Sequence, residues 1–184
     1  DKLAQVTDEI VVISLASKLS STYQMESQAI GMMRRKCRIE LIDSQAGCMA
    51  LGLIAIAAAK AANSGAKTDA LVKLTRRNIP RSKIHLAFDT LEFLTRSGRV
   101  SAAQAFLGSM LRVNPIMTLE DGEGRPVAKP RSRAKAIELL YKFAASFSNI
   151  EEMAIEDATT PDEADMLAER LGSRFPKERI FRSK

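Results

Sequence analysis

The chain has 184 residues, of which 46% are apolar and 27% are charged, an ordinary balance for a globular protein with a substantial core. Tryptophan is absent and aromatic residues make up only 5%, which leaves little side-chain surface for stacking nucleic-acid bases. Two cysteines without CxxC spacing and a single histidine fit none of the usual zinc-binding patterns, so we expect no metal and a cytoplasmic protein with reduced thiols.

The net charge of +6 is concentrated in the middle of the chain. Residues 71–135 hold 13 Lys and Arg against 5 Asp and Glu, whereas residues 1–70 hold 8 against 7. A basic zone of this kind suits an anionic ligand, a phosphate, an acidic protein partner or nucleic acid. The longest apolar run covers residues 49–62 and is too short to cross a bilayer, so we expect no transmembrane segment.

The first predicted element is a short buried strand at residues 10–13, where all four side chains are isoleucine or valine. Hydroxyl residues follow at positions 14, 17, 20, 21 and 22, and a helix is predicted over residues 22–35. Such a junction suits anion binding, because backbone N–H groups and hydroxyls donate there and the helix dipole favours negative charge. The alternative is an ordinary helix cap formed by Ser20, Ser21 or Thr22.

The next elements alternate between strands and helices. The sequence predicts a strand at 38–42, a largely buried helix at 45–63, a helix at 69–77 capped by Thr68, and a strand at 83–88. This alternation of strands and helices is typical of an α/β layer with parallel strands. We therefore expect the first three strands of the chain to share one largely parallel sheet.

The pattern changes in the second half of the chain. Short helices are predicted at 91–95 and 102–111, followed by a β-hairpin of two strands at 113–119 and 125–130 around an Asp-Gly turn. A long helix at 132–147, a strand at 153–155, a helix at 161–171 capped by Thr160 and a strand at 179–181 complete the chain. The change predicts two lobes: residues 1–98 form an α/β lobe and residues 99–184 an α+β lobe.

Three segments carry recognisable motifs. Residues 12–24 read V-I-S-L-A-S-K-L-S-S-T-Y-Q, residues 89–101 read D-T-L-E-F-L-T-R-S-G-R-V-S, and residues 129–136 read K-P-R-S-R-A-K-A. They resemble the DegV family patterns [SI]-x-L-S-S-x-L-S-G-T-Y-Q, D-T-L-x-x-L-x-x-G-G-R-[IV]-S and K-x-R-[ST]-x-x-K-A. A shorter Ile-Asp-Ser element at 42–44 and an N-P-I…D-G segment at 114–122 fit the same family. Departures occur at Ala16, Ser21 and Ser97.

The resemblance implies an α/β, DegV-like two-lobed fold that binds a long-chain fatty acid between its lobes. DegV proteins are lipid carriers in bacteria, and they present the fatty acid to a separate fatty acid kinase subunit. The resemblance therefore implies a protein that is not itself an enzyme and that has no catalytic residue and no cofactor besides the bound lipid. The apolar helices around 49–59 and 102–111 could line an acyl chain, although such helices more often pack a core.

The same resemblance assigns the ligand's carboxylate to the serine-rich loop. Ser17 falls on the second serine of the family pair and is the best candidate, whereas Ala16 could offer only its backbone N–H. The other candidates in the loop are Ser20, Ser14 and Thr22. A carboxylate needs two or three donors and little solvent, and this loop supplies hydroxyls and N–H groups.

Basic residues from the other motifs are expected near the head group. Arg99 and Arg131 are placed at the carboxylate end, on a surface offered to the kinase subunit, because a guanidinium suits planar oxyanions. Arg133 is a further candidate for partner contact.

Two family elements, T-S-Q-P and G-T-H-x-G-P-G, do not occur in the chain. We therefore expect a fragment or a short member with an incomplete ligand site. The main alternative is a basic module that binds nucleic acid or phosphate with no lipid role, although no specific nucleic-acid motif is visible. An acid–base enzyme could also be assembled from Asp43, Asp89, Glu92 and His85, but no nucleophile–base spacing supports it, and His85 fits a structural role.

Overall fold

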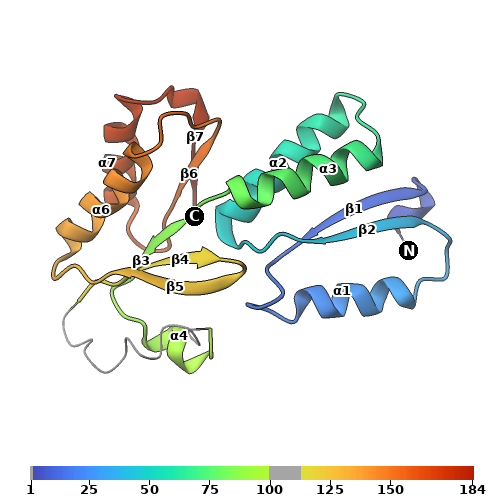
Figure 1. Cartoon of the computed structure of the whole chain (residues 1–184), viewed down its shortest axis with the longest axis horizontal. Coiled ribbons are helices and arrows are strands. Elements are labelled where there is room, and N and C mark those ends of the chain that lie inside the picture. The colour runs from blue at the N-terminus through green and yellow to red at the C-terminus, as the bar shows by residue number, and fades with distance from the viewer. Residues whose placement is uncertain (1, 100–112) are drawn as a thin grey trace. The chain divides into compact units, whose positions relative to one another are not determined.

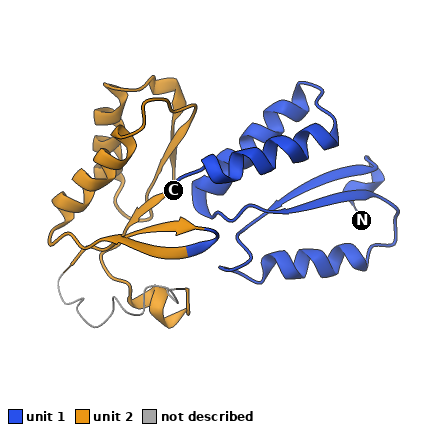
Figure 2. Cartoon of the chain, viewed as in Figure 1, with its two compact units in different colours: residues 1–83, 121–123 blue, residues 84–120, 124–184 orange. Residues whose placement is uncertain are grey.

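The computed structural model of the chain describes residues 2–99 and 113–184 (Figure 1). The helix expected at 102–111 lies outside the described residues. The chain divides into two compact units, coloured separately in Figure 2. Unit 1 comprises Asp1–Lys83 and Asp121–Glu123, and unit 2 comprises Ile84–Glu120 and Gly124–Lys184. The units divide between Lys83 and Ile84, earlier in the chain than the expected lobe boundary at residue 98.

Unit 1 is built on two parallel strands, β1 (Glu9–Ser14) and β2 (Arg38–Asp43), which pair from Glu9 opposite Arg38 to Ser14 opposite Asp43. The predicted parallel pairing of these two strands is confirmed. Helices α2 (Cys48–Asn63) and α3 (Thr68–Asn78) lie together on one side of the strand pair, and α1 (Thr22–Gly31) lies on the other (Figure 1). Short 3₁₀ turns, η1 (Leu3–Gln5) and η2 (Ile79–Arg81), complete the unit.

Two details of unit 1 differ from prediction. Helix α1 ends at Gly31 and does not reach residue 35, since glycine is a poor helix former. Thr68 is the first residue of α3 and does not cap it: its Oγ1 donates to Glu9 Oε2 at 2.6 Å, so the hydroxyl ties the helix to β1.

A cluster around Arg38 reinforces the amino end of the same strand pair. The guanidinium contacts Glu9 at 3.4 Å, Glu40 at 2.9 Å and also Asp69 of α3. Hydrogen bonds to Asp69 and then Glu40 raise the pKa of Arg38 above its ordinary value. The cluster therefore binds α3 to the strands at this end.

Unit 2 contains two small sheets. The first has the order β3 (His85–Ala87), β4 (Ile116–Glu120) and β5 (Glu123–Ala128), and β3 runs antiparallel to β4. The expectation that the strand at 83–88 joins the parallel sheet of the first two strands is therefore wrong. Its apolar pattern indicates a strand but does not choose a partner, and Ile116 and Met117 of β4 supply the buried neighbours.

The second sheet of unit 2 pairs β6 (Met153–Glu156) with β7 (Ile180–Ser183) in parallel. The helices of the unit are α4 (Glu92–Arg96), α6 (Arg133–Ala145), α7 (Pro161–Gly172) and the short turn η4 (Lys177–Arg179). The core beside this sheet is formed by Ile155, Ala164, Leu171 and Phe175. Across residues 2–99 and 113–184, every helix is too short or too polar to cross a membrane.

Candidate functional site

The carboxyl ends of β1 and β2 bring the serine-rich loop beside the loop that follows β2. Because the strands are parallel and Ser14 lies opposite Asp43, both chains leave the sheet at the same edge. Residues 14–22 and 43–47 are called the carboxyl edge below. In parallel α/β sheets, this edge is where ligands usually bind.

Asp43 organises the carboxyl edge. Its Oδ2 accepts a hydrogen bond from the Ser17 hydroxyl at 2.5 Å, and its Oδ1 accepts from the Ser17 N–H at 3.3 Å and the Gln45 N–H at 2.9 Å. All three donors are uncharged. The structure thus joins Ser17, the leading sequence candidate, to Asp43, which the predicted fatty acid site did not include. The Ile-Asp-Ser element was the available signal, because it places Asp43 at the end of β2.

The Ala16 N–H, which the sequence offered as a possible donor to the ligand, has a partner within the protein. The Ala16 side chain is fully buried, and the N–H donates to the carbonyl of Ala46 at 2.9 Å, so this N–H is already paired. The loop after β2 is fixed by its own turn, in which Ser44 Oγ accepts from the Ala46 N–H at 3.1 Å. Ala16 therefore joins the two loops and does not offer a donor to a ligand.

The remaining candidates of the serine-rich loop differ in whether their hydroxyl groups already have hydrogen-bond partners. Ser14 is 2% exposed, and its Oγ has no hydrogen-bond partner among the described residues. A buried hydroxyl without a partner is costly, so Ser14 is available to a ligand or a water. Ser20 Oγ, in contrast, lies 2.7 Å from Thr22 Oγ1 and accepts from the Thr22 N–H at 3.2 Å. Ser20 and Thr22 thus bond to each other at the start of α1, while Ser21, the N-cap residue, makes no side-chain capping hydrogen bond.

The tip of the β4–β5 hairpin also belongs to unit 1 (Figure 2). Gly122 has a φ of 77°, which favours glycine, and a Cβ added there would lie 3.6 Å from both Ala16 Cβ and Gln45 Cα. Beside it, Glu123 pairs with Lys18 at 3.2 Å. The hairpin tip therefore packs on the carboxyl edge and neutralises the nearest lysine of the loop.

The three arginine candidates lie in unit 2 and have different environments. Arg99 is exposed, and its Nη1 donates to the Ser97 carbonyl at 2.5 Å. Arg131 is exposed and makes no hydrogen bond or ion pair with any other residue that the structure describes. Both side chains lie where a partner can reach them.

Arg133, a sequence candidate for partner contact, is held by residues of its own unit. Its guanidinium pairs with Glu163 at 2.7 Å and Asp89 at 3.3 Å, and Nη2 donates to Thr160 Oγ1 at 3.3 Å. The hydrogen bond to Glu163 is the main cause that raises the pKa of Arg133. Thr160 lies at the predicted cap position of α7, but its hydroxyl serves Arg133 and not the helix. Arg133 therefore joins α6 to α7.

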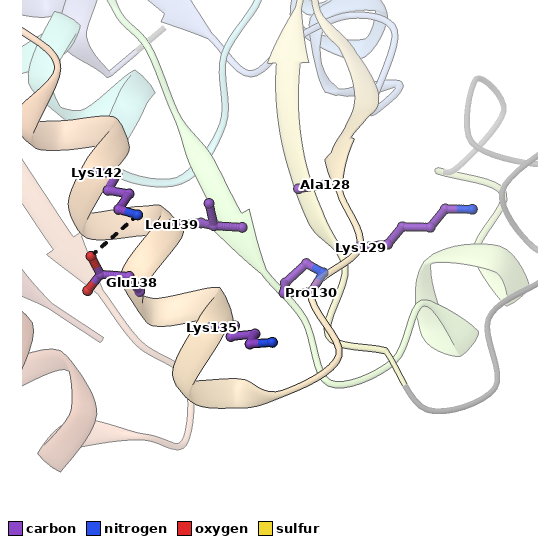
Figure 3. A pocket seen from close by; sticks show the side chains of 7 residues that line it. All are labelled: Ala128, Lys129, Pro130, Lys135, Glu138, Leu139 and Lys142. Atoms are coloured by element: carbon purple, nitrogen blue, oxygen red, sulfur yellow. Dashed lines mark ion pairs between the residues drawn. The ribbon is translucent and has the colours of Figure 1, made fainter.

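Unit 2 also contains an open cavity of about 360 Å³ between the end of β5 and helix α6 (Figure 3). Its lining residues are Ala128, Lys129, Pro130, Lys135, Glu138, Leu139 and Lys142. Glu138 contacts Lys142 at 3.9 Å and accepts from Arg170 at 2.6 Å, and the latter bond lowers the pKa of Glu138. The basic zone at 71–135 signalled this lysine-rich surface only in part, because Lys142 lies beyond it.

His85 lies in β3 and is held by an aromatic contact. Its ring stacks on Phe143 of α6 with 3.6 Å between centroids, and burial lowers the pKa of His85. Among residues 2–99 and 113–184, no group of three or more His, Cys, Asp or Glu side chains is arranged to hold a metal ion. His85 thus has a packing role within unit 2.

Comparison with known proteins gives a consistent result. A family model described as DegV, an uncharacterised protein family, matches residues 1–184. A DegV domain-containing protein of Clostridium acetobutylicum is 31% identical over 187 residues, which cover 98% of this chain and 66% of that protein. The chain spans 51% to 66% of the length of three such curated relatives.

Solved structures agree with the sequence comparison. The crystal structure of DegV from Bacillus subtilis, described as a fatty acid binding protein, superposes with a TM-score of 0.85 at 28% identity, over 99% of this chain and 66% of that one. A DegV family protein from Thermus thermophilus, described by its fatty acid binding, gives a TM-score of 0.84 at 26% identity, over 98% of this chain and 65% of that one. The predicted mixed α/β, DegV-like fold is confirmed.

Proposed function

The chain belongs to the DegV family, and from this we propose that it binds a long-chain fatty acid and presents the carboxyl group to a fatty acid kinase subunit. Two solved members of the family, from Bacillus subtilis and Thermus thermophilus, are described as binding fatty acid. The observation in this chain that carries the proposal is the cluster of polar groups at the carboxyl edge, where Ser17 and the buried, unpartnered hydroxyl of Ser14 lie on one loop.

The chemistry of the carboxyl edge supports a carboxyl head group. A carboxyl needs hydrogen-bond partners in a site with little solvent. Ser14 is almost fully buried, Ser17 is half-buried, and the backbone around them is fixed by the Ala16–Ala46 hydrogen bond and the turn at Ser44. We assign the head-group contact to Ser17 with Ser14 as its neighbour, and we leave Ser20 and Thr22 to the start of α1.

The acyl chain requires only apolar walls. Helix α2 is rich in Ala, Leu and Ile, yet several of its apolar side chains are only partly buried, among them Leu51, Leu53 and Ile56. We propose that this helix contributes apolar surface to the tail site. Cys37 and Cys48 are not joined in a disulfide, which suits a cytoplasmic carrier.

Organic-solvent extraction of the purified chain, followed by mass spectrometry, tests the proposal. We expect a co-purifying acid of about 16–18 carbons, a length that suits an ordinary ligand pocket. The chain stripped of lipid should bind the same acid again. Absence of any acid, together with no binding of added acid, would contradict the proposal. Tight, strongly salt-dependent binding of DNA in its place would favour the nucleic-acid alternative.

We assign Arg99 and Arg131 to the surface that receives the kinase subunit. Transfer of phosphate to the carboxyl group forms an acyl phosphate dianion, and arginine suits a surface that contacts phosphate groups. Arg99→Glu and Arg131→Glu should each leave fatty acid affinity within about twofold, while phosphate transfer by a partner kinase falls at least about tenfold. Lys73→Glu, the same charge change on the exposed face of α3, should change neither. Loss of binding in Arg99→Glu with normal phosphorylation of Arg131→Glu would contradict the assignment.

A further inference from the structure

We propose that a fatty acid binds at the carboxyl edge together with one proton, which the ligand carboxyl and Asp43 share through the hydroxyl of Ser17. This inference rests on the proposed function, because it requires a carboxylic acid at Ser17. It adds Asp43 to the site as a positioning residue that sets the protonation state of the bound ligand.

The argument begins with a count of protons at Ser17. A serine hydroxyl has one proton to donate and lone pairs that accept. In the structure, that proton points to Asp43 Oδ2, which lies 2.5 Å from Ser17 Oγ. The Ser17 N–H is also directed at Asp43, at 3.3 Å from Oδ1. Ser17 Oγ therefore presents lone pairs to a ligand, and an ionised carboxylate, which only accepts hydrogen bonds, has no donor there.

The second step concerns charge. A ligand oxygen in hydrogen-bond contact with Ser17 Oγ lies within about 5 Å of the Asp43 carboxylate, since two hydrogen-bond lengths separate them at most. Two carboxylates at this distance do not both stay ionised unless a cation lies between them. The three donors to Asp43 come from Ser17 and Gln45 and carry no charge. They hold the Asp43 side chain without neutralising it.

Within residues 2–99 and 113–184, the charged groups of the surrounding elements do not neutralise Asp43. Besides Asp43, the titratable residues of the loop, the hairpin tip, both strands and helices α1, α2 and α3 are Lys18, Asp121, Glu123, Tyr23, Glu26, Glu9, Arg38, Glu40, Cys48, Lys60, Asp69, Lys73, Arg76 and Arg77. Lys18 pairs with Glu123, and Arg38 pairs with Glu9, Glu40 and Asp69 at the opposite end of the strands. Among the described contacts, none of these residues forms an ion pair or hydrogen bond with Asp43. A proton from solvent is then the simplest neutralising charge.

The proton balance is complete without any further reactant. The free acid enters as a carboxylate, Asp43 accepts three hydrogen bonds and donates none, and one proton is taken from solvent. It rests either on the ligand, which donates to Ser17 Oγ while Ser17 donates to Asp43, or on Asp43, which donates to Ser17 Oγ while Ser17 donates to the ligand. Only O–H bonds form and break between the two arrangements, and the proton returns to solvent when the ligand leaves. The second arrangement presents an ionised carboxylate, the form that attacks a phosphoryl group.

Calorimetric titration with decanoic acid between about pH 6 and pH 8 tests the inference. The Kd of the unmodified chain should rise about tenfold per pH unit, as expected for uptake of one proton. The measured heat should also depend on the ionisation enthalpy of the buffer, with one proton bound per ligand. Asp43→Asn keeps the shape of the side chain without its charge and should give a Kd independent of pH. Asp162→Asn, which removes a charge from the first turn of α7, should keep the full slope.

1-Decanol provides a control that requires no substitution, because it carries an O–H donor and no charge. It should bind the unmodified chain with a Kd independent of pH. A flat Kd for decanoic acid and no dependence on buffer overturn the inference while leaving fatty acid binding intact. Absence of decanoic acid binding at every pH, together with failure to bind long-chain acids, overturns the proposed function and this inference with it.

Discussion

Two polar networks in the molecule differ in whether the charge at their centre is neutralised by an opposite charge. In unit 1, the Asp43 carboxylate accepts three hydrogen bonds from uncharged donors on Ser17 and Gln45. In unit 2, the Arg133 guanidinium contacts two carboxylates, Glu163 and Asp89, as well as Thr160. The second network neutralises its central charge internally, whereas the first does not. A network of the first kind responds to an added ligand or proton, and one of the second kind mainly holds elements together.

The contrast also separates neighbouring residues of one motif. Arg131 and Arg133 lie two positions apart, and both were predicted to contact the head group or a partner. Arg133 is 30% exposed at its side chain and joins α6 to α7, while Arg131 is exposed. Proximity in sequence therefore does not imply a shared role, because a helix start turns successive side chains in different directions.

The largest expected effect is a loss of stability when Asp43, the centre of the network in unit 1, is replaced. Asp43→Ala leaves three donors without their charged acceptor and should lower the free energy of unfolding by about 2–4 kcal/mol, given the usual strength of hydrogen bonds to charged groups. Urea denaturation measures the change. Asp162→Ala, at an exposed position of α7, should cost less than about 0.5 kcal/mol. Equal losses for the two variants would show that Asp43 does not organise the carboxyl edge.

Replacement of Arg133, the centre of the network in unit 2, should lower the free energy of unfolding by a smaller amount. Arg133→Met keeps an unbranched side chain but leaves Glu163 and Asp89 without their cation, and we expect a loss of about 1–2 kcal/mol because the pair is partly exposed. Arg131→Met is the matched control and should change the free energy of unfolding by less than about 0.5 kcal/mol. If both variants were neutral in urea denaturation, the distinction between the two arginines would not hold.

A smaller effect is expected at the start of α1. Ser20→Ala removes the acceptor for the Thr22 N–H and should lower the free energy of unfolding by about 0.5–1 kcal/mol, as for a lost helix cap. Fatty acid affinity should stay within about twofold of the unmodified chain. A large loss of affinity without loss of stability would instead move Ser20 into the ligand site.

The smallest effect involves a titratable group that neither network contains. Burial lowers the pKa of His85, so the unfolded chain takes up a proton at a higher pH than the folded chain does. The stability contribution is present above the unfolded value of about 6.5 and is lost as the pH falls from there through the lower folded pKa. His85→Phe keeps a ring on Phe143 and should reduce the fall in Tm between pH 7.5 and pH 5. An unchanged fall would exclude His85 as a source of the pH dependence.

Local patterns in the sequence were sufficient to predict most helices and strands. They failed where a strand pairing or a hydrogen bond depended on a residue far away in the chain. The parallel pairing of β1 with β2 and the Asp-Gly hairpin followed from apolar runs and turn residues. The sheet to which β3 belongs could not be predicted in this way, because its apolar residues fit either sheet. The paired N–H of Ala16 depends on Ala46 in a separate loop, so no feature of the serine-rich segment could reveal it.

The candidate site could likewise be predicted from the sequence only in part. Family-like spacing selected Ser17, but the direction of its hydroxyl is set by Asp43, 26 positions further along the chain. The ion pairs that hold Arg133 come from α7 and from the segment after β3, again beyond the motif. Motif spacing therefore located the loop, and tertiary contacts decided which of its residues are available to a ligand.

The central claim, that Ser17 contacts the carboxyl group of a fatty acid, is tested most directly by calorimetric titration of Ser17→Ala with a long-chain acid, beside Ser20→Ala as the control on the same loop. Ser17→Ala should weaken binding by about 1.5–3 kcal/mol, the range for a hydrogen bond to a charged group, while Ser20→Ala binds nearly as well as the unmodified chain. Unchanged affinity in Ser17→Ala, with the fold intact by circular dichroism, would contradict the claim.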